Sequence, residues 1–294
     1  MDRHPPILVE ALRNGTVESV HTAVAALADA RSVLATWGDA SFATFWRSAA
    51  KPLQAQTWID DGSFAATGWG EAELALICGS HDGGEGPTRL ATRMLTDLGL
   101  DAEALYCGGP EHMCSGNHIG FLAGCVHHGW DSPTYTAADH PAQLAALWRF
   151  EAAAGGDAPT AVDGCGILTY ATSVERAATV WAGLSGTCPE VAGAMRTYPE
   201  SVAGEGELDT EVMRALPGSL SKEGAEGLAC FTLPDGRGLA VKVLDGAERA
   251  IAPAAISALV QVLGLDQPPM SLGRFLIPER TNRDGAVVGR MRVL

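Results

Sequence analysis

Residues 42–62, FATFWRSAAKPLQAQTWIDDG, mark the place where the chain changes from a strand pattern to a helical one. Before this stretch, residues 7–12 and 17–28 are rich in apolar and β-branched residues and flank the turn-like sequence RNGT. This arrangement predicts an N-terminal β-hairpin, and a third strand is expected around 31–36. Within 42–62 the pattern favours a helix, so the helical part of the chain begins here.

The middle of the chain is mostly helical by pattern, because Ala- and Leu-rich segments are separated by Gly, Pro and Asp. After it, GLACFTLPDGRGLAVKVLDG (227–246) places two apolar runs around PDGRG and predicts a second hairpin. Strands at both ends with helices between them predict an α+β fold, an antiparallel sheet flanked by helices. We expect a single domain, 1–294, with a helical subregion around 85–215. The predicted helices are 71–78, 87–98, 141–154, 172–183, 207–216 and 247–264.

Composition excludes some classes of partner. The chain is 47% hydrophobic and 19% charged, which is typical of a folded globular protein. Its formal net charge of −15, with no local cluster of Lys and Arg, argues against nucleic acid and anionic membranes as partners. The N-terminal MDRHPPILVE resembles no export signal and no run of about 18 apolar residues follows, so we expect a cytoplasmic protein.

Cysteine and lysine usage point to particular residues. Seven cysteines are scattered without C-x-x-C spacing, so most are expected to be free, buried thiols. The basic residues comprise seventeen arginines and only three lysines, Lys51, Lys222 and Lys242. A base that must lose its proton near neutral pH has to be lysine rather than arginine. Each lysine is therefore a candidate for chemistry, although an arginine-rich composition could also leave three behind.

Ser48 and Lys51 are spaced i and i+3, which places both side chains on one face of the predicted helix. A neutral lysine amine can accept the serine proton as the oxygen attacks a carbonyl, and can return it to the leaving amine. Since S-x-x-K also occurs by chance in many proteins, a structural role for the pair is the alternative.

A second serine, Ser80, lies in the glycine-rich segment CGSHDGGEG beside His81, in a loop that could present side chains to a ligand or be an ordinary polar loop. Lys242 interrupts the apolar run GLAVKVLDG, either as an outward-facing strand lysine or as a second base, as in serine hydrolases of the β-lactamase kind. Lys222 lies in SKEGAEG, which we expect to be a loop before that strand, where it could bind a carboxylate or be solvated.

Two further segments, CSGNHIG and DGCG, place potential metal ligands among small residues. Two thiolates with a nitrogen or oxygen ligand could hold zinc, whereas buried thiols without a metal are the alternative. The residues concerned are Cys114, Asn117, His118, Asp163 and Cys165.

Eight ordered segments across residues 7–264 together resemble the L-asparaginase II family, typified by the rhizobial enzymes. They are LVEALRNGTVESVH, GDASFATFWRSAAKPLQAQ, ALICGSHDG, HMCSGNHIGFL, DHPAQ, VDGCGIL, SKEGAEGL and GLAVKVLDG. The resemblance implies a fold similar to the serine β-lactamases and glutaminases, and a homodimeric amidohydrolase that converts L-asparagine to L-aspartate and ammonia. The alternatives are a serine amidase acting on another small amide, and a catalytically lapsed relative that binds a small molecule or metal.

The resemblance also implies roles for single residues. It pairs Ser48 with Lys51, and we place Ser80 with Lys242, leaving open which serine attacks. Substrate binding is assigned to Arg47, His81, Asp163 and Lys222. A zinc ion would be held by Cys114, Cys165 and the lysine of a CSGKH-like segment, but position 117 is Asn here. An amide oxygen is a poorer zinc ligand than an amine, so we expect a lower zinc affinity, binding of another metal, or substitution of the missing ligand by His118.

Overall fold

The computed structural model describes residues 1–294, which fall into two compact units. Unit 1 comprises residues 1–44, 173–183 and 211–294, and unit 2 comprises residues 45–172 and 184–210. The chain therefore enters and leaves unit 2 twice. The organisation of 1–294 as a single domain stays a prediction.

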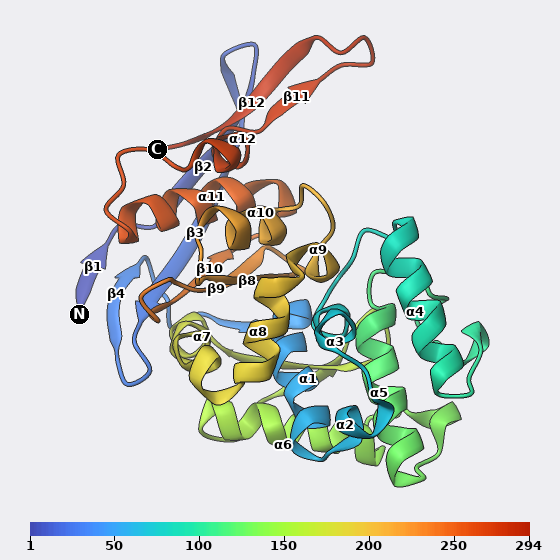
Figure 1. The fold of residues 1–294 in the computed structure, drawn as a ribbon. Helices are drawn as coiled ribbons and strands as arrows, with labels where there is room; N and C mark the ends of the chain where they lie inside the picture. The colour runs from blue at the N-terminus through green and yellow to red at the C-terminus, as the bar shows by residue number, and fades with distance from the viewer. The chain divides into compact units, whose positions relative to one another are not determined.

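Unit 1 is built on a nine-stranded sheet with the order β11-β12-β2-β3-β10-β9-β8, in which β4 also pairs with β3 and β1 pairs with β4 (Figure 1). All of these pairs are antiparallel except β1 with β4. Helix α11 (Glu248–Val262) packs on β2, β3 and β10. The strands are β1 (Asp2–His4), β2 (Ile7–Arg13), β3 (Thr16–Ala28), β4 (Val33–Trp37), β8 (Leu220–Gly224), β9 (Leu228–Thr232), β10 (Gly238–Val243), β11 (Glu279–Thr281) and β12 (Val287–Val293).

Both predicted hairpins are confirmed. Strands β2 and β3 join at Asn14 and Gly15, whose φ angles of 46° and 83° lie in the left-handed region that Asn and Gly tolerate best. Strands β9 and β10 flank PDGRG and are buried along their whole length. An antiparallel sheet with helices packed on it is the α+β fold that the pattern predicts.

The C-terminal part of unit 1 was not assigned from the sequence. A short 3-10 helix (Met270–Leu272) and α12 (Gly273–Leu276) lead into the hairpin β11–β12. Strand β12 pairs with β2 at the opposite end of the sequence, with Arg292 opposite Glu10. One expectation is corrected: Lys222 lies in β8 rather than in a loop, because SKEG pairs with β9.

Unit 2 is mainly helical, with a small sheet in the order β5-β7-β6. All five helices predicted in the middle of the chain occur, as α3, α4, α6, α7 and α10. Its elements are β5 (Ala43–Phe45), η1 (Arg47–Ala50), α1 (Lys51–Asp60), α2 (Ser63–Thr67), α3 (Glu71–Ile77), α4 (Glu85–Asp97), η2 (Ala102–Ala104), α5 (Ser115–His128), η3 (Ser132–Thr134), α6 (Pro141–Ala154), β6 (Thr160–Val162), β7 (Leu168–Ser173), α8 (Pro189–Thr197) and α9 (Pro199–Val202); β5, β7, α7 (Val174–Thr187) and α10 (Leu208–Ala215) run across the unit boundaries.

Helix α5 is the buried centre of unit 2 and was not predicted. Its glycines at 116, 120 and 124 recur every fourth residue and so share one face. A Cβ atom at Gly116 would lie 2.2 Å from the carbonyl oxygen of Leu76, and one at Gly124 would lie 2.5 Å from the ring of Trp58. This glycine stripe lets α5 approach α1 and α3 closely enough to bring the segment CSGNHIG next to them.

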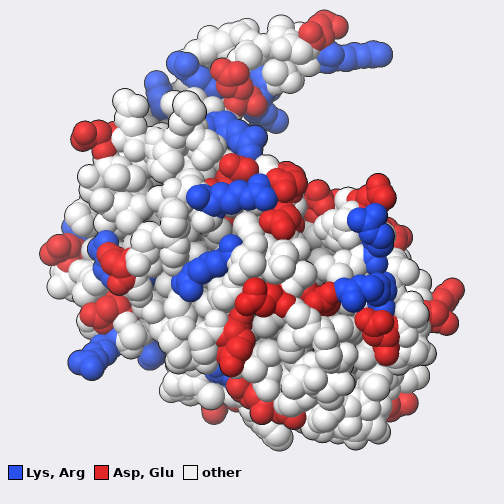
Figure 2. Space-filling view, in the orientation of Figure 1, with Lys and Arg blue, Asp and Glu red and all other residues white.

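None of the helices has the length and apolar character needed to cross a membrane. On the face drawn in Figure 2, basic and acidic side chains are interspersed.

Candidate active site

The first turn of the helical part of unit 2 carries Ser48 and Lys51. Trp46 is fully buried and anchors this turn, because its indole Nε1 donates to Thr172 Oγ1 at 2.8 Å and its backbone N–H donates to the Tyr170 carbonyl at 2.8 Å. Residues 47–50 form a 3-10 turn that continues into α1, which tolerates Pro52 because the first helical N–H groups have no intrahelical partner. Lys51 is thereby directed inward and is 3% exposed.

Lys51 Nζ has an acceptor for each of its three N–H bonds. It donates to the Gly79 carbonyl at 2.7 Å, to Ser80 Oγ at 2.9 Å and to Cys114 Sγ at 3.3 Å. The structure therefore brings Lys51 together with Ser80. Ser48 and Lys51 line one cavity, but no hydrogen bond joins them, which differs from the expected pairing.

Cys114 and Cys165 interact beside Lys51. A hydrogen bond from Cys165, supported by the positive charge of Lys51, lowers the pKa of Cys114. The same hydrogen bond, together with burial, raises the pKa of Cys165. Ionisation of the pair is therefore favoured at Cys114, whose Sγ accepts a hydrogen bond from Lys51.

Asn117 is oriented by a buried chain of amide hydrogen bonds. Its Nδ2 donates to Gln54 Oε1 at 3.1 Å, and Gln54 Nε2 donates to the Leu168 carbonyl at 3.3 Å and to the Tyr170 hydroxyl at 3.4 Å. Asn117 and Gln54 both line the cavity with Ser48, Lys51 and Cys165. The bond to Gln54 fixes the orientation of the Asn117 amide beside the cavity.

The cavity has a volume of about 10 Å³, which is about the space that one water molecule needs. Arg47 and Asp163 form part of its wall and are joined by two hydrogen bonds of 2.7 Å. Arg47 has a φ of 50°, a left-handed conformation that costs a non-glycine residue about 1–3 kcal/mol. This conformation is held by the bidentate pair and by the bond from Arg47 N to Thr169 Oγ1 at 2.9 Å.

The loop that carries Ser80 is fixed by its neighbours. His81 is 1% exposed, and its Nδ1 accepts from Gly83 N at 3.0 Å while its Nε2 donates to Ser115 Oγ at 2.8 Å. Burial lowers the pKa of His81 to about 4, so the ring is neutral. Both ring nitrogens are engaged within the protein and order the loop, and the substrate-binding role expected of His81 stays a prediction.

Ser80 is held from the backbone as well. Its N–H donates to the Val202 carbonyl at 2.7 Å, and a Cβ atom at the preceding Gly79 would lie 2.4 Å from the Ser201 carbonyl oxygen. The Ser80 amide is therefore not available as an oxyanion donor.

The residues proposed for zinc supply few donors. Zinc sites use three or four strong protein ligands, whereas the structure holds no group of three His, Cys, Asp or Glu side chains arranged for a metal ion. His118 donates or accepts at Tyr135 Oη through Nδ1, and its buried Nε2 has no partner. Burial lowers the pKa of His118 to about 3, so it is neutral. Two thiols and an amide do not fit a zinc centre of the usual kind.

The two remaining lysines lie in unit 1 and are buried. Lys242 is 5% exposed, and its Nζ donates to the backbone carbonyls of Glu226 at 2.6 Å and Val243 at 2.5 Å. Burial lowers its pKa. Lys222 is 2% exposed and donates to the Glu223 carbonyl at 3.0 Å. Burial rules out the alternative in which these two lysines are solvated. The pairing of Lys242 with Ser80 stays a prediction.

The sequence did not single out Gln54, Ser115, Tyr135 or Tyr170. Gln54 could have been found, since it follows Lys51 at i+3 and lies on the same face of α1. The others are brought to the site by contacts between segments far apart in the sequence.

Comparison with known proteins gives a family and a distant structural likeness. The family model described as L-asparaginase II matches residues 9–293. No curated protein matches this sequence. Among solved structures, a β-lactamase from Mycobacterium bovis is similar with 15% sequence identity and a TM-score of 0.37, over 82% of this chain and 94% of that chain.

Proposed function

Because this chain belongs to the L-asparaginase II family, we propose that it hydrolyses L-asparagine to L-aspartate and ammonia through a serine activated by lysine. One observation carries the mechanism: buried Lys51 donates a hydrogen bond to Ser80 Oγ and lines a cavity with Ser48. Lysine, unlike arginine, can lose its proton and serve as a base.

Lys51 Nζ donates to three acceptors in this arrangement and must lose one proton to become that base. Loss of that proton leaves a neutral amine. The amine then accepts the hydroxyl proton of Ser80 or Ser48 as that oxygen attacks the side-chain amide carbon of asparagine.

The remaining steps follow from the same groups. The lysine ammonium returns the proton to the leaving nitrogen, ammonia departs, and an aspartyl ester remains on the serine. Water then attacks the ester with the amine as base, which releases aspartate and restores the hydroxyl. The Ser80 amide donates to Val202, and within the turn at 47–50 the amides of Arg47 and Ala49 are also bonded. The backbone N–H of Ser48 is therefore our candidate for the oxyanion donor.

Substrate recognition is assigned to the bidentate pair in the cavity wall. In the structure these two side chains bond to each other and the cavity holds about one water molecule, so asparagine can bind only after they separate. Arg47 would then offer a planar guanidinium to the α-carboxylate of asparagine, and Asp163 would accept from its α-ammonium group. Glutamine is longer by one methylene, so we expect its kcat/KM to be roughly 10–200-fold lower.

The family resemblance also implies a homodimer, which is part of this proposal. Analytical ultracentrifugation of the purified protein measures its oligomeric state.

The test is ammonia release from asparagine and glutamine by the purified protein and three variants. Lys51→Met and Lys51→Arg should lower kcat for asparagine by roughly 100–10,000-fold, because arginine keeps the charge but cannot act as a base. Arg89→Met, on the exposed surface of α4, is the matched control and should retain full activity. Thermal unfolding of each variant checks that the fold is intact.

An activated aspartyl ester should label either Ser48 or Ser80, and mass spectrometry of Ser48→Ala and Ser80→Ala then identifies the attacking oxygen. Turnover of asparagine by folded Lys51→Arg at the unmodified rate would overturn the mechanism. Absence of turnover of any small amide by the unmodified protein would overturn the function.

A further inference from the structure

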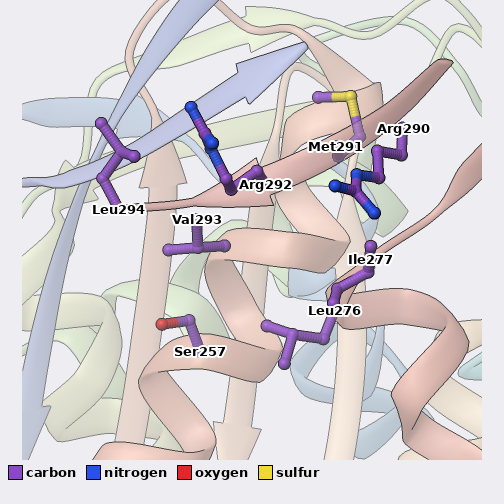
Figure 3. Close-up of a pocket in the computed structure, with 8 residues that line it drawn as sticks. All are labelled: Ser257, Leu276, Ile277, Arg290, Met291, Arg292, Val293 and Leu294. Atoms are coloured by element: carbon purple, nitrogen blue, oxygen red, sulfur yellow. The ribbon is translucent and has the colours of Figure 1, made fainter. Parts of the chain in front are cut away.

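A groove in unit 1 is not used by the proposed reaction. It has a volume of about 440 Å³, within the range of about 300–1,000 Å³ that is usual for small-molecule sites. Its wall is formed by Ser257 of α11, Leu276 of α12, Ile277, and the end of β12 from Arg290 to Leu294. Figure 3 shows these side chains around the space between the strand and the two helices.

The apolar part of the groove is built by secondary structure and stays open to solvent. Met291 is 1% exposed and is the buried part of its wall, whereas Ile277 is 50% exposed. Leu276 and Val293 are half-buried at the same place. Apolar surface that lies in a concavity and keeps contact with water favours occupation by an apolar ligand group.

Arg290 gives the groove one uncompensated positive charge. The guanidinium of its neighbour Arg292 is neutralised by Glu10 across the strand pair. Arg290 has no hydrogen bond or ion pair in this structure, and its ladder partner Glu279 does not reach it. In Figure 3 the guanidinium of Arg290 extends toward Ile277, whereas that of Arg292 extends away from Ser257 and Leu276.

No acidic residue lines the groove, although the whole chain carries a net charge of −15. The unpaired charged side chain in the wall, Arg290, is therefore opposite in sign to the net charge of the chain, and it favours an anionic group placed next to it. A guanidinium binds a carboxylate through two parallel hydrogen bonds. Ser257 adds a hydroxyl in the wall of the groove.

We propose that this groove binds a small amphipathic monocarboxylate, with the carboxylate on Arg290 and the aliphatic part on Leu276, Ile277 and Val293. The site belongs to unit 1 and is separate from the residues assigned to amide hydrolysis in unit 2. A test of ligand binding in this groove is therefore independent of a test of asparaginase activity.

Octanoate is the probe, titrated into the full-length protein with binding measured by calorimetry and by changes in backbone amide NMR signals. We expect saturable binding that shifts the signals of residues 276–277 and 290–293. Octan-1-ol, which has the same tail without the charge, should bind roughly tenfold or more weakly. Octylammonium should not bind.

Two variants locate the charge. Arg290→Gln should weaken octanoate binding roughly tenfold or more and leave octanol binding unchanged, while Arg283→Gln, on the exposed hairpin turn outside the groove, should change neither. Equal affinity of octanoate for the unmodified and Arg290→Gln proteins would overturn the proposal. So would signals of the groove residues that respond to protein concentration but not to octanoate, since a second copy of the chain would then cover the groove.

Discussion

The side chain at position 117 distinguishes this site from the zinc site that the family resemblance implies. At position 117 the family resemblance implies a lysine, but here Asn117 lines the cavity and donates through Nδ2 to Gln54. Lys51 Nζ donates a hydrogen bond to Cys114 Sγ at 3.3 Å. A single side chain thus changes a set of two thiolates and an amine into two sulfur atoms and a weak oxygen donor.

Restoring the amine should restore metal affinity. After dialysis against a chelator and addition of zinc, Asn117→Lys should retain close to one zinc ion per chain, while the unmodified protein retains much less. The measurement is metal content by mass spectrometry, together with the thermal unfolding midpoint with and without zinc. Asn117→Gln keeps the amide and is the control. Full zinc retention by the unmodified protein would contradict this expectation.

At the level of secondary structure, the glycine stripe of α5 allows this helix to lie close to α1 and α3. Glycine is unfavourable inside a helix by about 1 kcal/mol, so a local propensity argument does not predict a helix over CSGNHIGFLAGC. The loss is offset because α5 is almost entirely buried and packs directly against α1 and α3. Tertiary packing here overrides the preference of the local sequence.

Substitution of Gly116, the glycine of the stripe that lies closest to a neighbouring backbone, should cause a large loss of stability. Gly116→Ala places a Cβ atom 2.2 Å from a backbone oxygen of α3, which cannot move aside as a flexible side chain could. We expect the free energy of unfolding to fall by at least about 2 kcal/mol. Urea unfolding measures it.

Gly86→Ala is the matched control for that measurement. A Cβ atom at this α4 position meets nothing within 4 Å, so stability should stay unchanged or rise by up to about 1 kcal/mol. Equal effects of the two substitutions would show that helix propensity, rather than the contact with α3, controls the outcome.

For the molecule as a whole, buried neutral histidines make stability depend on pH. Burial, reinforced by the charge of Lys51, lowers the pKa of His81 to about 4 and that of His118 to about 3. In the unfolded chain both return to about 6.5. Below that pH the unfolded state binds protons that the folded state excludes, so acid favours unfolding.

We therefore expect the free energy of unfolding to be level above about pH 7 and to fall between about pH 6.5 and pH 4. The slope contributed by each histidine approaches about 1.4 kcal/mol per pH unit. Urea unfolding between pH 7.5 and pH 5 measures it. His118→Gln should reduce the slope, and substitution of the exposed His127 by Gln should leave it unchanged. An identical slope in His118→Gln would contradict the assignment.

Local pattern was sufficient for two of the hairpins, for several of the helices and for the residue types able to do chemistry. Period and turn residues are properties of neighbouring positions, which is why β2–β3, β9–β10 and five helices between them were predicted. The small number of lysines likewise singled out Lys51, Lys222 and Lys242 without any structure, and all three are buried.

Contacts between distant segments determined the rest. The partner of Lys51 depends on packing between α1 and the turn after α3, so spacing alone suggested Ser48 where the structure brings in Ser80. The orientation of Asn117 requires Gln54, and β12 exists because it pairs with β2 across almost the whole chain. Hydrogen bonds and close packing form only when the folded chain brings such groups together, and a one-dimensional pattern contains no such distances.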